Sequence, residues 1–460
     1  MNDPLTSLLP SRRRALQTIS SGFGYLAFQA MSTMSASAAA NPLAPKPAHF
    51  NPRAKRVIFL CMQGGPSHVD TFDYKPRLNT DNGKAAQRGA KWLGSPWEFA
   101  QHGESGLPIS SLFPHVANHA DDLCVINSMH TDLPNHPQAF TQMHTGNFQF
   151  TRPSLGAWSL YGLGTENDSL PGFVTLSPPN GAHNYGSAFL PAIYQGTPIG
   201  GRGGRQSRFQ EQAEPVSNIK NNLLDKDLQR LQLDYINSLN KEKLKRDQFN
   251  PQVEGLIESF ELAFRMQEEV PDVLDIDEEP AAIQSLYGID NAQTAGFGRK
   301  CLAARRMAEA GVRFIEVGQG NWDHHRNLQF AMENSCGQID KPIAGLLQDL
   351  KQRDLLKDTL VIWGGEFGRT PYGQSTNGRD HNHRGFSMWM AGGGVKGGMR
   401  YGATDEYGHH AVENKVHIHD WHATVLHLLG LDHEQLTYRY AGRDFRLTDV
   451  HGKVVRGILS

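Results

Sequence analysis

Carboxylate and imidazole side chains recur together at two places in the second half of the chain. Asp323 is followed by His325, and Glu366 is followed by His381 and His383. Both groups are common metal ligands, and a mixed set suits zinc or manganese, whereas calcium or magnesium is favoured if oxygen ligands prevail. These residue types therefore predict a site for one or two divalent ions. The alternative is that the side chains are only solvated groups on loops.

The predicted ligands follow segments that have the composition of buried strands. Apolar and β-branched runs predict strands at residues 56–62, 123–126, 312–317, 359–363 and 386–391. The stretch between the last two runs is predicted to be a loop. Polar groups at the carboxyl ends of parallel strands meet at one edge of a sheet, so we expect the ligands to converge there.

Two further strand ends carry polar residues. His68 and Asp70 follow the first predicted strand, and Thr131 and His136 follow the second. Asp70 is a further predicted metal ligand at the same sheet edge. His68 is not expected to bind the metal itself. We expect it to orient a side chain that does.

The order of elements predicts the fold class. Strands that alternate with helical patterns indicate an α/β fold with a mostly parallel sheet flanked by helices. Residues 54–460 are predicted to form a single domain after a proline-containing linker at residues 41–53. Between about residues 221 and 290 the apolar spacing is helical, which predicts a helical insertion.

Composition limits the possible partners. The chain has 460 residues, which is long enough for a substantial core, and its formal net charge is -2. This charge excludes a general polyanion binder, so nucleic acid is not an expected partner. The four cysteines lie far apart and show neither a zinc-binding spacing nor a disulfide framework.

The first forty residues have the layout of an export signal. Arg12, Arg13 and Arg14 are followed by a mildly apolar stretch and then by the alanine-rich residues 36–40. This order predicts a twin-arginine signal peptide at residues 1–40 and hence a periplasmic or secreted protein. The apolar stretch contains too many polar residues to span a bilayer, so no stable membrane anchor is expected. A disordered basic tail is the alternative, but it explains only the arginines.

Several motifs resemble known families. Residues 340–347, 355–362 and 365–368 resemble the late segment of sulfatases and their alkaline-phosphatase-like relatives, in which Glu366 would take the place of a metal-binding aspartate. More closely, the mature chain resembles the DUF1501 family of exported bacterial proteins. The motifs that carry this resemblance are residues 64–73, 322–325, 365–371, 378–381 and 442–445.

The chain departs from sulfatases at two positions that matter for chemistry. Sulfatases end the first strand in paired aspartates, whereas this chain has Gln63, Gly64 and Gly65. The position of the sulfatase nucleophile falls on Asn135 or His136. Asparagine is not a nucleophile, so the covalent esterase mechanism cannot simply be transferred to this chain.

The resemblance implies roles for particular residues. The metal ligands would be Asp323, His325, Glu366 and His381, with His383 and Asp70 as further ligands. Arg369 and Lys396 would bind the substrate anion, and Asp380 would orient His381. His136 would be the nucleophile or general acid, with Thr131 as a second catalytic residue.

Two functions follow from this resemblance. The first is an exported metal-dependent hydrolase of sulfate or phosphate esters, which would act on a small-molecule or polysaccharide substrate through an ion that polarises the ester. The second is a catalytically inactive relative that keeps the fold and part of the site as a binding or assembly protein. The missing nucleophile and aspartate pair would explain this second function.

Overall fold

The structure is a computed structural model that describes residues 41–178, 181–200, 225–247, 251–374 and 377–460. The predicted signal peptide at residues 1–40 lies outside the described residues. Residues 221–224, at the start of the predicted helical insertion, also lie outside them. Among the helices that are described, none is both long enough and apolar enough to cross a membrane.

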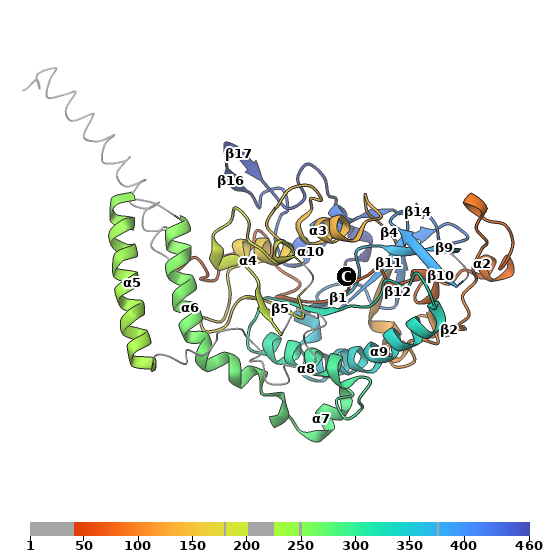
Figure 1. The fold of residues 1–460 in the computed structure, drawn as a ribbon, viewed down its shortest axis with the longest axis horizontal. Helices are drawn as coiled ribbons and strands as arrows, with labels where there is room; N and C mark the ends of the chain where they lie inside the picture. The colour runs from red at the N-terminus through yellow and green to blue at the C-terminus, as the bar shows by residue number, and fades with distance from the viewer. Residues whose placement is uncertain (1–40, 179–180, 201–224, 248–250, 375–376) are drawn as a thin grey trace, which may run out of the picture.

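A central sheet organises the described part of the chain (Figure 1). The strands of this sheet lie in the order β12-β4-β11-β8-β1-β7-β5-β6. A further strand, β15, pairs with β4 and lies outside this order. Their bounds are β1 (Arg56–Met62), β4 (Leu123–His130), β5 (Phe173–Leu176), β6 (Thr197–Ile199), β7 (Phe314–Gln319), β8 (Thr359–Gly364), β11 (Phe386–Ala391), β12 (Met399–Tyr401) and β15 (Val416–His417). The predicted runs form strands here because they are apolar enough to be buried on both faces of the sheet.

One strand in this sheet runs against the others. β11 is antiparallel to both of its neighbours, β4 and β8, whereas the other strand pairs of this sheet are parallel. The predicted fold class, an α/β fold with a mostly parallel sheet, is therefore confirmed. The carboxyl ends of β1, β4, β7 and β8 consequently share one edge of the sheet, and β11 ends at the opposite edge.

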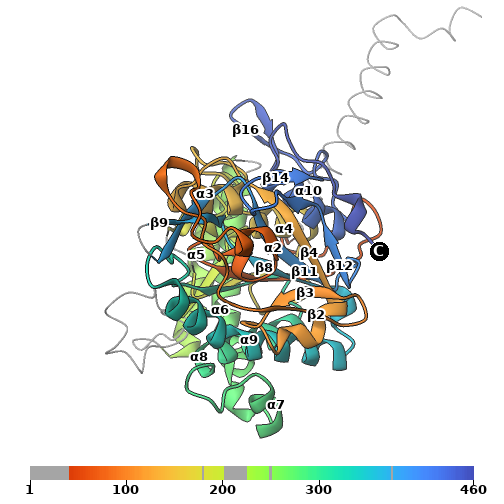
Figure 2. The ribbon, with the colours of Figure 1, turned by 90° about the vertical axis from the view of Figure 1, so that its right-hand side faces the viewer.

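Helices cover both faces of the sheet (Figures 1 and 2). The helices α3 (His136–Thr145), α4 (Leu155–Leu163) and α10 (Ile418–Leu428) lie on one face, and α8 (Ala295–Glu309) and α9 (Leu328–Gln352) lie on the other. Phe59 of β1 packs against His144 of α3 and Trp421 of α10. The core therefore lies between the sheet and these two helical layers.

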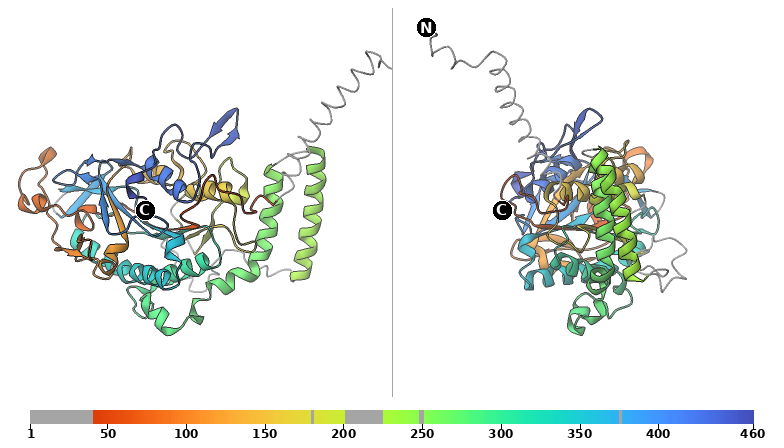
Figure 3. Two further views of the ribbon diagram at one scale, coloured as in Figure 1. Left: turned by 180° about the vertical axis from the view of Figure 1, so that it is seen from behind. Right: turned by 90° about the vertical axis from the view of Figure 1, so that its left-hand side faces the viewer.

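A pair of long helices lies at one end of the molecule (Figure 3). These are α5 (Lys226–Asp247) and α6 (Pro251–Leu274), which fall in the stretch predicted to be helical. The remaining α-helices and strands of the described residues are α2 (Pro76–Thr80), α7 (Ala281–Leu286), β2 (Phe99–His102), β3 (Leu107–Ser110), β9 (Gly368–Gln374), β10 (Gly378–Asn382), β13 (Ala403–Thr404), β14 (Ala411–Glu413), β16 (Tyr438–Tyr440) and β17 (Arg443–Phe445).

The stretch between β8 and β11 corrects one prediction. We expected a loop, but β9 and β10 pair there as an antiparallel hairpin in which His381 lies opposite Arg369. The prediction was wrong because the glycines and charged residues of these strands hide the strand pattern. This hairpin fixes the positions of the His381 and Arg369 side chains relative to each other.

Candidate metal centre

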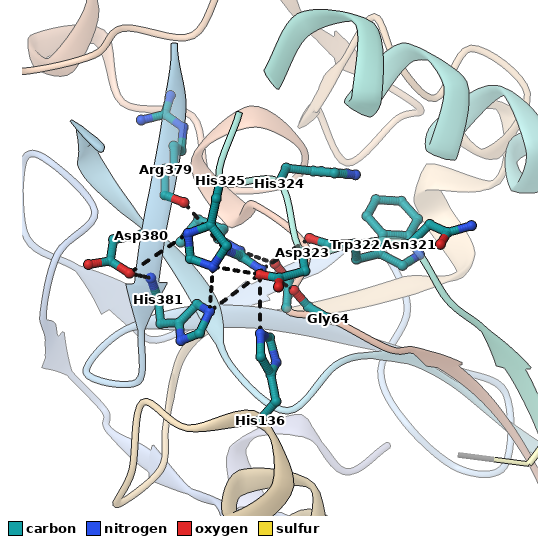
Figure 4. A network of polar contacts seen from close by, with 12 residues as sticks. Gly64, His136, Asn321, Trp322, Asp323, His324, His325, Arg379, Asp380 and His381 are labelled. Carbon is teal, nitrogen blue, oxygen red and sulfur yellow. Dashed lines mark hydrogen bonds and ion pairs between the residues drawn. The ribbon is translucent and has the colours of Figure 1, made fainter. Parts of the chain in front are cut away.

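Four side chains from three parts of the chain meet at the carboxyl edge of the sheet (Figure 4). Asp323 Oδ1 lies 2.8 Å from His325 Nε2, 3.1 Å from His136 Nε2 and 3.3 Å from His381 Nε2. The Nε2 atoms of His325 and His381 are 2.9 Å apart. We call these four residues the edge cluster.

The fold explains why these residues meet. His136 is the first residue of α3, which begins shortly after β4 ends. Asp323 and His325 lie in the loop that follows β7, and His381 lies in β10. The carboxyl ends of β4 and β7 lie at the same edge of the sheet, and the hairpin after β8 extends over this edge. The edge cluster therefore results from the parallel direction of these strands.

Each imidazole of the edge cluster is oriented by an acceptor at its other nitrogen. His136 Nδ1 donates to Glu366 Oε1 at 2.5 Å, and His381 Nδ1 donates to the carbonyl oxygen of Pro134 at 2.6 Å. His325 Nδ1 donates to the side-chain oxygen of Gln374. With the protons on Nδ1, all three Nε2 atoms turn a lone pair toward Asp323. This arrangement is typical of histidines that bind a metal.

Arg369 keeps Asp323 ionised. Its Nη2 atom lies 2.6 Å from Asp323 Oδ1. Burial by itself would raise the pKa of Asp323, but the hydrogen bond and charge of Arg369 lower this pKa well below its ordinary value. Burial by itself would lower the pKa of His136, but the hydrogen bond and charge of Glu366, together with Asp323, raise this pKa above its ordinary value. The edge cluster therefore offers one ionised carboxylate beside three imidazoles, and a metal ion bound there would displace a proton from His136.

This donor set fits a divalent cation. A tetrahedral zinc site with bonds of about 2.0–2.1 Å places its ligand atoms about 3.3 Å apart, close to the separations in the edge cluster. His136 Nε2 is buried, and its 3.1 Å contact with Asp323 Oδ1 lacks hydrogen-bond geometry, so no group in the described part of the chain forms a hydrogen bond with this nitrogen. A cation at this point would satisfy that nitrogen. The Asp323 side chain remains 48% exposed, so the edge cluster is open to solvent.

Glu366 lies behind the edge cluster. Its buried carboxylate accepts the backbone N–H of Gly64 at 3.1 and 3.2 Å and also accepts the His136 proton. We expected Glu366 to bind metal directly, but the structure places its carboxylate on the far side of His136 from the other three members of the edge cluster. Its position makes it the group that orients His136.

The predicted anion-binding residues are not available for that role. The Arg369 side chain is fully buried, and its donors bind Asp323 and the backbone carbonyls of Gly64, Gly65, Trp322 and Arg379. Lys396 follows β11, so it lies at the opposite edge of the sheet, where its Nζ atom lies 3.3 Å from the Gly457 carbonyl. The prediction failed for Lys396 because β11 runs antiparallel.

Asp70 and His68 lie under the hairpin rather than in the edge cluster. The buried Asp70 carboxylate forms two ion-pair contacts with Arg379, at 2.7 and 3.0 Å, and accepts a hydrogen bond from Ser67. His68 Nε2 donates to the Gly408 carbonyl at 2.7 Å. The structure therefore does not bring the predicted ligand Asp70 to the metal position, because its charge is paired with Arg379.

Three further predicted residues lie near the edge cluster. Thr131 is buried and donates to Gln142 at 2.7 Å, which holds the loop before α3. Asp380 accepts the backbone N–H of His381 at 2.8 Å, and its carboxylate is 4.0 Å from His325 Nδ1. His383 does not join the edge cluster with its imidazole. Its carbonyl instead accepts the Thr131 N–H at 2.9 Å.

A polar pocket of about 290 Å³ lies next to the edge cluster, and sequence reasoning had not assigned its lining residues Arg384 and His409 to the site. His381, Asp380 and His383 line it, together with Arg384 and His409. Gln87 Nε2 lies 3.4 Å from His409 Nδ1. Arg384 directly follows a histidine-rich motif, which is the signal that could have identified it.

The fold and the edge cluster together define an α/β protein with a candidate metal centre at the carboxyl edge of a mostly parallel sheet. The chain belongs to the DUF1501 family, described as a protein of unknown function, whose family model matches residues 54–459. The sequence-based assignment to this family is therefore confirmed.

Some solved structures share features of this fold. The phosphonate monoester hydrolase SpPMH from Silicibacter pomeroyi matches with 13% identity and a TM-score of 0.39, over 88% of this chain and 76% of its own. The lipoteichoic acid synthase LtaP from Listeria monocytogenes matches with 11% identity and a TM-score of 0.34, over 88% and 78%.

The PsFucS1 sulfatase from Pseudoalteromonas sp. matches with 13% identity and a TM-score of 0.35, over 83% of this chain and 68% of its own. A search of curated proteins found no match. Similarity at this level does not transfer an activity to this chain.

Proposed function

We propose that this protein is a metal-dependent hydrolase of sulfate or phosphate esters that uses a single divalent ion, zinc by preference. The observation that carries the proposal is the edge cluster, in which three oriented imidazoles and one carboxylate face each other beside an open polar pocket. A bound divalent ion would supply Lewis acidity toward an ester oxygen at this position.

The geometry supports one ion rather than two. A second ion would need further carboxylates at the end of β1, where this chain has Gly64. The Gly64 N–H instead binds Glu366, and Asp70 is paired with Arg379. These contacts use the carboxylates that a second ion would require.

Residues of the polar pocket provide the recognition that we first expected from Arg369 and Lys396. Arg384 supplies a guanidinium group, which suits the paired oxygens of a sulfate or phosphate. In this proposal His409, which lines the same pocket, donates a hydrogen bond to an ester oxygen. His136 is used to hold the metal, so it is not the nucleophile in this proposal.

The substrate and the site of action are further parts of the proposal. We propose a small-molecule or polysaccharide ester, because the pocket is open and polar rather than enclosed and apolar. The twin-arginine layout of residues 1–40 supports action in the periplasm or outside the cell.

The second candidate is a binding or assembly protein that holds metal without turnover. It is favoured by the start of α3, where Asn135 and His136 provide no hydroxyl or thiol nucleophile. This candidate predicts a metal-loaded protein that is inactive toward every ester.

One experiment tests the hydrolase and separates it from this second candidate. Metal content and turnover of aryl sulfate and aryl phosphate esters are measured for the wild type and for His381→Ala, Arg384→Ala and Lys396→Ala. We expect one edge-cluster metal that is lost in His381→Ala, and a KM raised about tenfold or more in Arg384→Ala, because a charged hydrogen bond is removed. Lys396→Ala is the matched control and should behave like the wild type. Metal that is lost in His381→Ala, without any turnover in the wild type, would support the binding protein, and the absence of metal at the edge cluster would exclude both.

A further inference from the structure

A second group of potential metal ligands lies inside the molecule, beneath α3. It consists of Cys61 in β1, Glu316 in β7 and His144 in α3, whose ligand atoms all lie within 4.8 Å of one another. Cys61 and Glu316 are 0% exposed and His144 is 5% exposed. We call these three residues the inner cluster.

The register of the sheet brings the inner cluster together. Glu316 lies beside Phe59 of β1 on one side and beside Thr175 of β5 on the other. Cys61 is two residues beyond Phe59 and therefore points to the same face of the sheet. α3 covers this face, because Phe59 packs against His144.

The protonation of His144 is constrained by its surroundings. Its Nδ1 lies 2.9 Å from the Phe140 carbonyl, which can only accept, so Nδ1 carries a proton. Its Nε2 lies 3.3 Å from Glu316 Oε1. In a neutral imidazole this nitrogen would turn a lone pair toward a carboxylate oxygen. Either a proton or a metal ion is therefore needed between the two groups.

Two buried oxygen atoms distinguish a proton from a metal ion at this position. Glu316 Oε2 and Thr175 Oγ1 are both buried and have no hydrogen-bond partner in the described part of the chain. An unsatisfied buried polar group is costly, and such groups are rare in folded proteins. A proton on His144 would satisfy only Oε1 of Glu316. A cation between the three side chains would also compensate Oε2 and the cysteine sulfur.

We propose that Cys61, His144 and Glu316 bind a structural divalent metal ion, zinc by preference, that is separate from the metal of the edge cluster. Thiolate sulfur selects zinc over calcium, magnesium and manganese. The charges also balance, since one thiolate and one carboxylate neutralise a divalent ion inside the core. Burial raises the pKa of the Cys61 thiol well above its ordinary value, so the thiolate forms when the metal displaces the proton.

This ion would connect the core to the edge cluster through α3. α3 carries His136 at its first position and His144 two turns later. A metal bound to His144, Cys61 and Glu316 would join this helix to β1 and β7, and it would hold His136 in place. Because the inner cluster has no exposed side chain, the ion would enter during folding and would resist chelators in the folded protein.

The sulfur ligand makes the proposal testable without reference to activity. The full chain is produced in cobalt-containing medium, dialysed against a chelator that strips the edge cluster, and its near-ultraviolet absorption is recorded. We expect one retained cobalt per chain with a thiolate-to-cobalt charge-transfer band. The band should disappear in Cys61→Ser and Glu316→Gln, but it should persist in Cys301→Ser, which alters another fully buried cysteine.

A measurement on the wild type tests the proposal even if the variants fail to fold. X-ray absorption of the chelator-treated zinc protein should show one sulfur at about 2.3 Å from the metal. Absence of retained metal, or retained metal without sulfur, would overturn the proposal in favour of a protonated His144 paired with Glu316. A hydrolase that lacks this ion would still be possible, so the two proposals can fail independently.

Discussion

At the residue scale, Glu366 is the buried partner that orients His136 in the candidate metal centre. Its carboxylate is fully buried and accepts hydrogen bonds from the Gly64 backbone and from His136 Nδ1. A buried carboxylate makes the imidazole a stronger ligand and fixes which nitrogen faces the metal. The effect depends on the negative charge as well as on the geometry, and a substitution can separate these two contributions.

We predict that Glu366→Gln weakens zinc binding at the edge cluster by about 10–100-fold, because the amide keeps the shape of the side chain but loses its charge. The affinity is measured by competition with a chromogenic chelator. Glu413→Gln, which alters an exposed carboxylate in β14, is the control and should bind zinc like the wild type. Equal affinities for Glu366→Gln and the wild type would show that Glu366 has no role in metal binding.

At the element scale, the end of β1 sets the position of the loop that carries Asp323. Gly64 has a φ of +119°, and a Cβ atom at this position would lie 2.6 Å from the Asp323 backbone nitrogen. The chain therefore requires glycine here for both conformation and space. The backbone of Trp322 and Asp323 occupies the space that a side chain at position 64 would need, so the loop after β7 lies directly against the residue that binds Glu366.

Gly64→Ala should displace Asp323 and reduce metal occupancy of the edge cluster, with a loss of about 1–3 kcal/mol or more in the free energy of unfolding. Urea denaturation and metal analysis measure the two effects. Gly83→Ala is the matched control, since Gly83 also has a positive φ of +81° but no atom within 4 Å of the added Cβ. It should lose only the conformational contribution of about 1–2 kcal/mol and should keep its metal. Full occupancy in Gly64→Ala would contradict this account of the β1 end.

At the scale of the whole molecule, buried histidines link stability to pH. Burial lowers the pKa of His422 to about 3 and that of His419 to about 4. His422 Nε2 donates to the Met143 carbonyl at 2.7 Å, so the folded protein holds this imidazole neutral between α10 and α3. In the unfolded chain histidine has a pKa of about 6.5.

The free energy of unfolding should therefore fall as the pH is lowered below about 6.5. In this range the unfolded chain binds protons that the folded state excludes, and His422 alone contributes a slope of up to about 1.4 kcal/mol per pH unit, which continues toward pH 3. Urea denaturation at pH 7 and pH 5 measures this slope. A chelator is present in both series, so that metal release at the edge cluster does not contribute.

His422→Gln provides the comparison for this pH dependence. The variant should be less stable at pH 7, because it alters the contact with Met143, but it should lose less stability on acidification. Identical slopes for the variant and the wild type would show that protonation of His422 does not contribute.

Local sequence patterns were sufficient to predict much of this protein. The apolar runs that became β1, β7 and β8 predicted a mostly parallel sheet, because burial on both faces requires continuous apolar residues. The same pattern placed Asp323 and His325 at a strand end. It also predicted that polar groups from several strands would lie at one edge, since parallel strands end on the same side.

Only the tertiary structure decided which side chains are available to bind a ligand. Availability depends on partners far away in the sequence, such as Arg379 for Asp70 and the Gly64 carbonyl for Arg369. The direction of β11 likewise removed Lys396 from the site, although nothing in its local sequence indicates an antiparallel strand. The inner cluster joins three elements through strand register and helix packing, so no spacing in the sequence could reveal it.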